Sequence, residues 1–125
     1  MKVNVILICL ALALLAVAAL CVGAMHRTSH ELMAMAQEAA SALPDDPETA
    51  AQRLEEFAAR WERTEPRWQF IASHSDLEKV SDELLDARSA LDAGDLAAAH
   101  LACERIPASI ESILGKELPT LGNIF

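Results

Sequence analysis

The chain has 125 residues, of which 53% are hydrophobic, and it carries a formal net charge of −9 at pH 7. The apolar excess is concentrated in the first 25 residues, whereas residues 26–125 carry 9 basic and 19 acidic side chains, a net charge of −10. An acidic surface of this kind repels nucleic acid and anionic lipid headgroups, which argues against both as partners of this part of the chain.

Residues 3–25 form an uninterrupted apolar run with no charged side chain and with Asn4 as its one polar residue. As a helix, this run reaches about 34 Å, which is enough to cross a hydrocarbon core of roughly 30 Å. We therefore predict a transmembrane anchor over residues 1–25 and an acidic helical domain over residues 26–125. The alternative is a signal sequence that starts at Lys2 and ends at Val22-Gly23-Ala24, although typical signal cores are only about 7–15 apolar residues long.

The positive charges beside the apolar run indicate its orientation. The amino terminus and Lys2 precede the run, whereas Arg27 follows it. Because positive charge favours the cytoplasmic side, we predict a cytoplasmic amino terminus and a single pass through the cytoplasmic membrane. The domain over residues 26–125 is then extracytoplasmic.

A capping-box pattern, Thr28-Ser29-His30-Glu31, follows the anchor. It can start a new helix or lie inside one that continues from the membrane, and we favour a short break or a kink. Pro44-Asp45-Asp46-Pro47 then ends one helix and starts another, with Asp46 as the N-cap and Pro47 at the first helical position. Between these signals lies a weak apolar stripe in a segment rich in Ala and Met, which comprises Leu32, Met35, Ala36, Ala39 and Leu43.

The helix that starts at Pro47 has one apolar face, which comprises Ala50, Leu54, Phe57 and Trp61. Pro66 interrupts this pattern, so the sequence predicts either a break, with Thr64 capping a new helix, or a kinked helix that runs on. In the kinked alternative, Trp61 and Trp68 lie near one face because they are seven residues apart.

Residues 66–114 carry the strongest pattern, two amphipathic helices separated by Asp92-Ala93-Gly94-Asp95, and predict an antiparallel helical hairpin. The predicted core residues of its first helix are Phe70, Ile71, Leu77, Val80, Leu84, Leu85 and Leu91. Those of its second helix are Leu96, Ala99, Cys103, Ile106, Ile110 and Ile113. Gly94 suits the left-handed position that ends a helix, and Asp95 suits the N-cap of the next one.

Residues 115–125 are too apolar for a loose end. In a hairpin folded about residues 93 and 94, residues whose numbers sum to about 187 lie side by side. Position 123 then approaches position 64. We therefore predict that Ile124 and Phe125 pack against Phe57, Trp61 and Trp68 and close the core.

Side chains suited to chemistry are few and dispersed. His26 and His30 have the spacing of two metal ligands on a helix, but no third ligand accompanies them, so we predict no metal site. His74 lies beside the predicted apolar stripe, where a carboxylate such as Glu78 or Glu111 would hold it. Phosphate-binding loops, nucleophile elbows and paired-cysteine motifs are absent from the sequence, so we predict no catalytic residue, no cofactor and no enzymatic activity.

The three cysteines do not form a disulfide framework. Cys9 and Cys21 lie about 18 Å apart along one predicted helix, which is too far for a bond within the chain. Cys103 falls on the apolar stripe of the last helix, where we predict a small core residue.

A set of features occurs together in this chain: the apolar N-terminal segment, Trp61 and Trp68 at seven-residue spacing, and a turn at Asp95. To these belong the segments Phe70-Ile71-Ala72-Ser73-His74-Ser75-Asp76-Leu77 and Leu121-Gly122-Asn123-Ile124-Phe125. In these features, residues 61–125 and the anchor resemble the DUF4363 family of small bacterial membrane-associated proteins. The resemblance implies a membrane location and this architecture but no mechanism, because the family's function is uncharacterised.

The sequence thus predicts an all-α protein, in which a transmembrane helix precedes a small antiparallel bundle built on a long helical hairpin. We expect a non-enzymatic accessory or scaffolding module that binds another membrane protein or forms a homo-oligomer, and that binds no nucleic acid. The candidate interaction residues are Trp61, Trp68, His74, Asn123, Ile124 and Phe125. The alternative is an extracytoplasmic sensor or binding protein for a small ligand or metal, with His74 and the two tryptophans lining its pocket.

Overall fold

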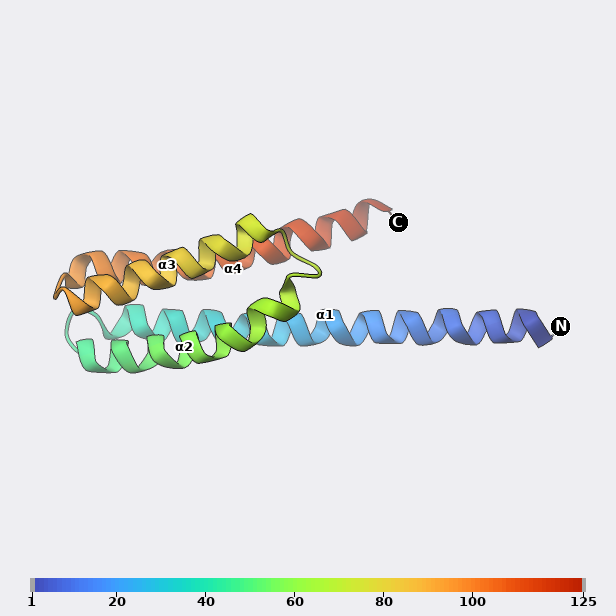
Figure 1. Ribbon diagram of the computed structural model, residues 1–125, viewed down its shortest axis with the longest axis horizontal. Coiled ribbons are helices and arrows are strands. Elements are labelled where there is room, and N and C mark those ends of the chain that lie inside the picture. The colour runs from blue at the N-terminus through green and yellow to red at the C-terminus, as the bar shows by residue number, and fades with distance from the viewer. Residues whose placement is uncertain (1, 125) are drawn as a thin grey trace.

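The computed structural model describes the backbone of residues 2–124 and the side chains of residues 2–114. These residues form four helices and no strand: α1 (Lys2–Ala42), α2 (Pro47–Trp68), α3 (His74–Asp92) and α4 (Leu96–Ile124). The predicted all-α bundle with a long N-terminal helix is confirmed (Figure 1).

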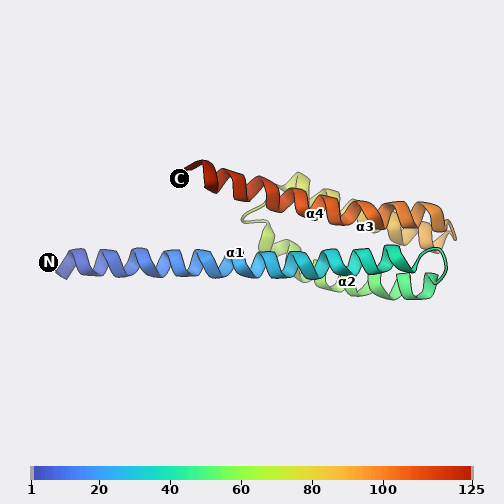
Figure 2. The same cartoon turned by 180° about the vertical axis from the view of Figure 1, so that it is seen from behind.

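The helices pack around one core as an antiparallel bundle. Helix α1 packs against α2 and α4, α4 packs against α3, and a smaller contact between α2 and α3 closes the ring. The N-terminal half of α1 extends alone beyond the bundle (Figure 1, Figure 2). Exposure changes where α1 enters the bundle: Leu20 is 74% exposed, whereas Met25 is 8% exposed and Leu32 is completely buried.

Helix α1 is continuous, so the predicted break or kink at residues 28–31 is wrong. The groups of the expected capping box are used elsewhere. Ser29 Oγ donates to the Met25 carbonyl oxygen at 2.7 Å, and the Glu31 carboxylate accepts a hydrogen bond from the Arg60 guanidinium on α2. The chain therefore leaves its apolar segment and enters the bundle as one helix.

Helix α2 begins as predicted. The Asp46 carboxylate accepts the Thr49 amide hydrogen at 3.1 Å, and Pro47 occupies the first turn. Hydrogen bonds from the Thr49 hydroxyl and amide lower the pKa of Asp46, because they favour its charged form. Of the two predicted courses at Pro66, the continuous one is observed, because α2 runs through this proline and ends two residues later at Trp68.

Because α2 ends at Trp68, the apolar residues that follow it are not placed in the core. Ser73 caps a new helix by accepting the Asp76 amide hydrogen at 3.3 Å, so α3 begins at His74. Phe70 and Ile71 lie in the connection and are exposed, as is Leu85 on the outer face of α3. The prediction that these three belong to the core is therefore wrong. The other predicted core residues of α3 are buried or packed against the core: Leu77, Val80, Leu84 and Leu91.

The connection between α3 and α4 has the predicted form. Gly94 has a φ of +77°, and Asp95 Oδ1 accepts the Ala98 amide hydrogen at 3.1 Å. The predicted apolar stripe of α4 is buried from Ala99 to Ile113, and Leu96 packs against its edge. Several core positions are alanines with no exposed area, which allows the helices to approach closely: Ala36, Ala39, Ala50, Ala87 and Ala99.

Candidate functional site

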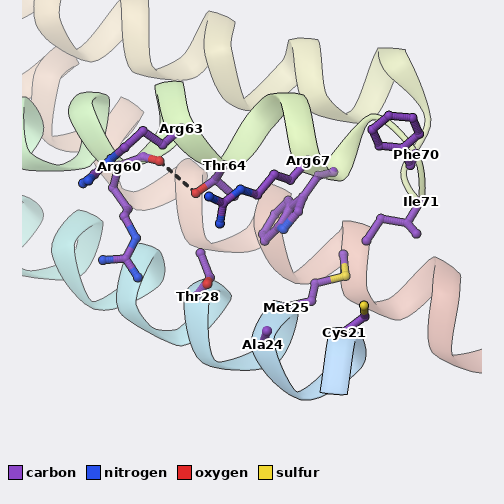
Figure 3. A pocket seen from close by; sticks show the side chains of 11 residues that line it. Cys21, Ala24, Met25, Thr28, Arg60, Arg63, Thr64, Arg67, Phe70 and Ile71 are labelled. Carbon is purple, nitrogen blue, oxygen red and sulfur yellow. Dashed lines mark hydrogen bonds between the residues drawn. The ribbon is translucent and has the colours of Figure 1, made fainter. Parts of the chain in front are cut away.

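A cleft of about 550 Å³ lies where α1 enters the bundle (Figure 3). It opens between α1, the last turns of α2 and the connection from α2 to α3. Its lining residues are Cys21, Ala24, Met25, Thr28, Arg60, Arg63, Thr64, Arg67, Trp68, Phe70 and Ile71. The cleft therefore joins the end of the apolar run to the first buried turns of the domain.

The floor of the cleft comes from one face of α1. Cys21, Ala24, Met25 and Thr28 follow helical spacing, so their side chains point to the same side. Met25 is buried against the bundle, whereas Cys21 and Ala24 are exposed. The floor is consequently apolar, and the Thr28 hydroxyl lies at its end (Figure 3).

The wall of the cleft is basic. Arg60, Arg63 and Arg67 recur along one face of α2, and no acidic residue belongs to the lining. Arg60 pairs with Glu31, so its charge is compensated. Among the side chains that the structure describes, Arg63 and Arg67 make no ion pair, and both are exposed. Two exposed arginines without an ion pair among the described side chains therefore belong to this wall, and Figure 3 shows Arg67 reaching toward α1 while Arg63 runs back along α2.

The rim is apolar and protrudes. The amide hydrogens of Ile71 and Ala72 are donated to the Trp68 carbonyl oxygen at 3.0 and 2.8 Å, which folds the connection tightly onto the end of α2. This fold leaves Phe70 91% exposed and Ile71 43% exposed. The rim therefore carries two adjacent apolar side chains that the bundle does not cover.

Comparison with known proteins identifies the family. The family model described as "Domain of unknown function (DUF4363)" matches residues 21–124. The chain belongs to the DUF4363 family. No curated protein and no solved structure matches it.

The family match is broader than the resemblance in the sequence. It covers nearly the whole DUF4363 chain and includes residues 26–60, which the resemblance did not use. This stretch supplies the second half of α1 and most of α2, and with them Thr28 and Arg60 of the cleft. The matched segment thus contains every residue that lines the cleft.

The two tryptophans of this DUF4363 protein lie in the core. Trp61 and Trp68 are 3% and 4% exposed, and their rings meet edge to face with centroids 5.7 Å apart. Trp61 also stacks on Phe57 with centroids 6.4 Å apart. The indole faces are therefore occupied within the bundle, although Trp68 contributes to the inner end of the cleft. The predicted role of this pair in binding a partner stays a prediction.

Of the remaining candidate residues, the structure describes the side chain of His74 alone, and this residue does not join the tryptophans in a pocket. His74 is exposed in the first turn of α3, and among the described side chains it makes no ion pair with Glu78 or Glu111. It does not line the cleft. The side chains of Asn123 and Ile124, and the whole of Phe125, lie outside the described residues, as does their predicted packing on the tryptophans.

Other titratable groups lie away from the cleft or within the core. His100 contacts the Ala40 carbonyl oxygen through Nδ1 and Glu104 through Nε2, both at 2.9 Å. Burial raises the pKa of the Cys103 thiol to about 11, in agreement with the predicted core position. The rings of His26 and His30 stack at 6.5 Å, and within residues 2–114 they belong to no group of three or more side chains placed to hold a metal.

Sequence reasoning missed the cleft because its parts come from three separate segments. The arginines stand at helical spacing in the sequence, but only the packing of α2 on α1 sets them beside the end of the apolar run. The exposure of Phe70 depends on the early end of α2. One signal in the sequence could have indicated the site: Arg60, Arg63 and Arg67 stand at helical spacing in a domain that is otherwise acidic.

Proposed function

We propose that this DUF4363 chain is a non-enzymatic, single-pass protein of the bacterial cytoplasmic membrane. In this proposal its acidic domain lies outside the cytoplasm and serves as an accessory or scaffolding module for another membrane protein. The absence of catalytic motifs from the sequence supports the non-enzymatic part. The membrane part rests on the form of α1.

Helix α1 is the observation that carries the proposal. Among the described residues it is the one helix long and apolar enough to cross a membrane. Its large apolar side chains are exposed on all sides from Val3, at 68%, to Leu20, at 74%. A helical segment that is apolar all round and unburied in its own protein suits a lipid environment, and the apolar run of about 34 Å matches a hydrocarbon core of roughly 30 Å.

The orientation is tested by labelling with a membrane-impermeant maleimide. Cys9 and Cys21 are replaced by alanine, and exposed Ser89 on α3 is replaced by cysteine as the reporter. Intact bacterial spheroplasts should label this variant, while the parent without the reporter should stay unlabelled because Cys103 is buried. Labelling that appears only after lysis would place the domain in the cytoplasm instead.

The accessory role calls for a surface that a partner can cover. Leu85 on α3 and Leu101 on α4 are 63% and 48% exposed, and their positions are level with one another across the turn at Gly94. Two exposed leucines at the same level of a helical hairpin support binding to an apolar surface of a partner.

The partner is tested by gentle crosslinking in the membrane, detergent extraction and mass spectrometry. We expect one reproducible membrane protein with the wild type and its loss with the Leu85→Ser/Leu101→Ser double variant. A Ser89→Ala variant, exposed on the same helix, serves as the control. Recovery of this chain alone, or of the same partner with the double variant, would contradict the scaffold proposal or its surface, respectively.

A further inference from the structure

We propose that the cleft binds the phosphate of an anionic phospholipid from the membrane that holds α1. The inference rests on the membrane anchor proposed above. Arg63 and Arg67 supply the charge, the α1 face at Ala24 and Thr28 supplies the floor, and Phe70 supplies an apolar contact to the lipid beside it.

The position of the cleft along α1 places it in the headgroup layer. Residues 3–24 of a helix span about 33 Å, close to the thickness of the hydrocarbon core. The headgroup regions add about 5–7 Å on each side, which corresponds to the next four or five residues of α1. The stretch from Ala24 to Thr28 therefore leaves the hydrocarbon at the depth where lipid phosphates lie.

The charge of the cleft opposes that of the whole domain. The acidic ends of the connections, at Asp45, Asp46, Asp92 and Asp95, lie at the opposite end of the bundle (Figure 1). From Thr28 to Ala42, α1 rises about 21 Å, which exceeds two screening lengths of about 8–10 Å at physiological salt. Glu62 and Glu65 also stand on α2 near the arginines, but neither lines the cleft. The repulsion of anionic headgroups inferred from the net charge is therefore weakest at the cleft.

The chemistry of the wall suits a phosphate. A guanidinium group can donate two parallel hydrogen bonds to phosphate oxygens, and the charge of either arginine is unopposed among the described side chains. Figure 3 shows Arg67 pointing from α2 toward α1, on the side of Thr28. The Thr64 hydroxyl already donates to the Arg60 carbonyl oxygen at 2.8 Å, so, among the described side chains, Arg63 and Arg67 are the charged donors without an ion pair that this wall offers a ligand.

The apolar rim favours a lipid over free phosphate. Figure 3 shows Phe70 and Ile71 at the Cys21 end of the cleft, nearer the apolar run than the ends of the two arginines, and both residues are exposed. An exposed apolar side chain such as Phe can enter the boundary between headgroups and acyl chains while basic groups next to it stay hydrated. A free phosphate ion has no apolar part that could contact Phe70 or Ile71.

The test uses the full chain in phosphatidylcholine vesicles that contain a minor fraction of either brominated phosphatidylglycerol or brominated phosphatidylcholine. Bromine quenches tryptophan fluorescence at short range, and Trp68 lines the inner end of the cleft. Titration of each brominated lipid gives its relative affinity for the site. The variants are Arg63→Gln/Arg67→Gln and the control Arg88→Gln/Arg105→Gln, which removes two exposed arginines elsewhere.

We expect the wild type and the control to prefer the anionic lipid by about 25-fold, since each arginine near the headgroups contributes about fivefold. The Arg63→Gln/Arg67→Gln variant should lose this preference, and Arg63→Lys/Arg67→Lys should keep most of it. Circular dichroism of each variant checks that it is folded. The lysine pair provides the comparison if the glutamine pair does not fold.

Three results would overturn the inference. They are equal quenching by both lipids in the wild type, an unchanged preference in Arg63→Gln/Arg67→Gln, and reversal of the quenching by excess inorganic phosphate, which would indicate a soluble ligand. Alkaline carbonate extraction of the same vesicles separates the two proposals. Chains released by carbonate would refute the membrane anchor together with the lipid site, whereas retained chains without lipid preference would refute the lipid site alone.

Discussion

Trp61 on α2 donates its indole N–H to Ser81 Oγ on α3 at 2.9 Å, and the same hydroxyl donates to Glu65 Oε2 on α2 at 3.3 Å. Ser81 thus bridges two side chains that lie one turn apart. The bridge stands where α2 and α3 meet, which is the smallest helix contact in the ring of the bundle. These hydrogen bonds therefore help to hold α2 and α3 together at the interface with the least packing between helices.

Ser81→Ala should destabilise the domain by about 1–3 kcal/mol, because the buried indole N–H loses its acceptor. Urea unfolding in detergent, followed by circular dichroism, measures this change. Ser89→Ala, on the exposed side of the same helix, should be nearly neutral. In a Trp61→Phe background the cost of Ser81→Ala should shrink; an equal cost in both backgrounds would contradict the role assigned to the hydrogen bond.

Phe70 and Phe57 should respond in opposite ways to truncation. Phe57 is completely buried, so Phe57→Ala should cost about 3–5 kcal/mol of folding free energy. Phe70 is 91% exposed, so Phe70→Ala should leave the melting temperature almost unchanged. Thermal unfolding of both variants in the same detergent provides the comparison, and a large loss with Phe70→Ala would place this ring in the core after all.

Gly94→Ala should cost about 1–2 kcal/mol through the backbone alone. The φ of Gly94 is +77°, which a residue with a Cβ adopts only with strain, yet no atom lies within 4 Å of the place where this Cβ would stand. Gly94→Asn should cost less, because asparagine tolerates the left-handed conformation. Equal losses for alanine and asparagine in chemical unfolding would indicate a steric cause instead.

Cys103 should react slowly with thiol reagents while the domain is folded. With a pKa raised by burial to about 11, its thiol carries roughly a hundredfold less thiolate near neutral pH than an ordinary cysteine. A Cys9→Ala/Cys21→Ala chain in detergent should therefore be labelled only after denaturation. Rapid labelling of the folded chain would contradict the buried position.

The same thiol gives the domain a dependence on alkaline pH. Folding raises the pKa of Cys103 from its ordinary value of 9.0, so this contribution is fully present below pH 9. It is lost as the pH rises toward 11, because the unfolded chain releases the proton first. Cys103→Ala should flatten the fall in unfolding free energy between these values, and identical pH profiles would exclude the thiol as the cause.

The sequence was sufficient where a local signal and the core pattern agree. Asp46 and Pro47 mark the start of α2, and Gly94 and Asp95 mark the turn before α4, because each is suited to a specific position at a helix end. The periodic apolar residues after each boundary extend over enough turns to define one buried face. Local signals misled where a tertiary partner competes for the same group. Glu31 could have completed a capping box, but Arg60 on the neighbouring helix binds its carboxylate.

Phe70 shows why a periodic pattern can fail at a helix end. Phe70 stands seven residues before Leu77, a spacing that places two residues on the same helix face. This holds only if one helix contains both residues. Ser73 starts a new helix instead, and its capping role was not predicted. The cleft depends on this ending together with the pairing of α1 and α2, so a search along the chain alone could not assemble it.

Because α1 is one continuous helix, the rotation of its N-terminal segment about the helix axis fixes the direction in which the bundle faces. One residue inserted before Met25 would turn the bundle by about 100° around the helix axis, whereas seven would nearly restore its bearing and lift it by about 10 Å. A partner protein that packs against one face of the proposed membrane helix would therefore contact a defined face of the bundle outside the membrane. With the proposed membrane anchor, α1 therefore acts as a rigid rod, and the side chains of residues 3–24 determine the direction in which the bundle faces.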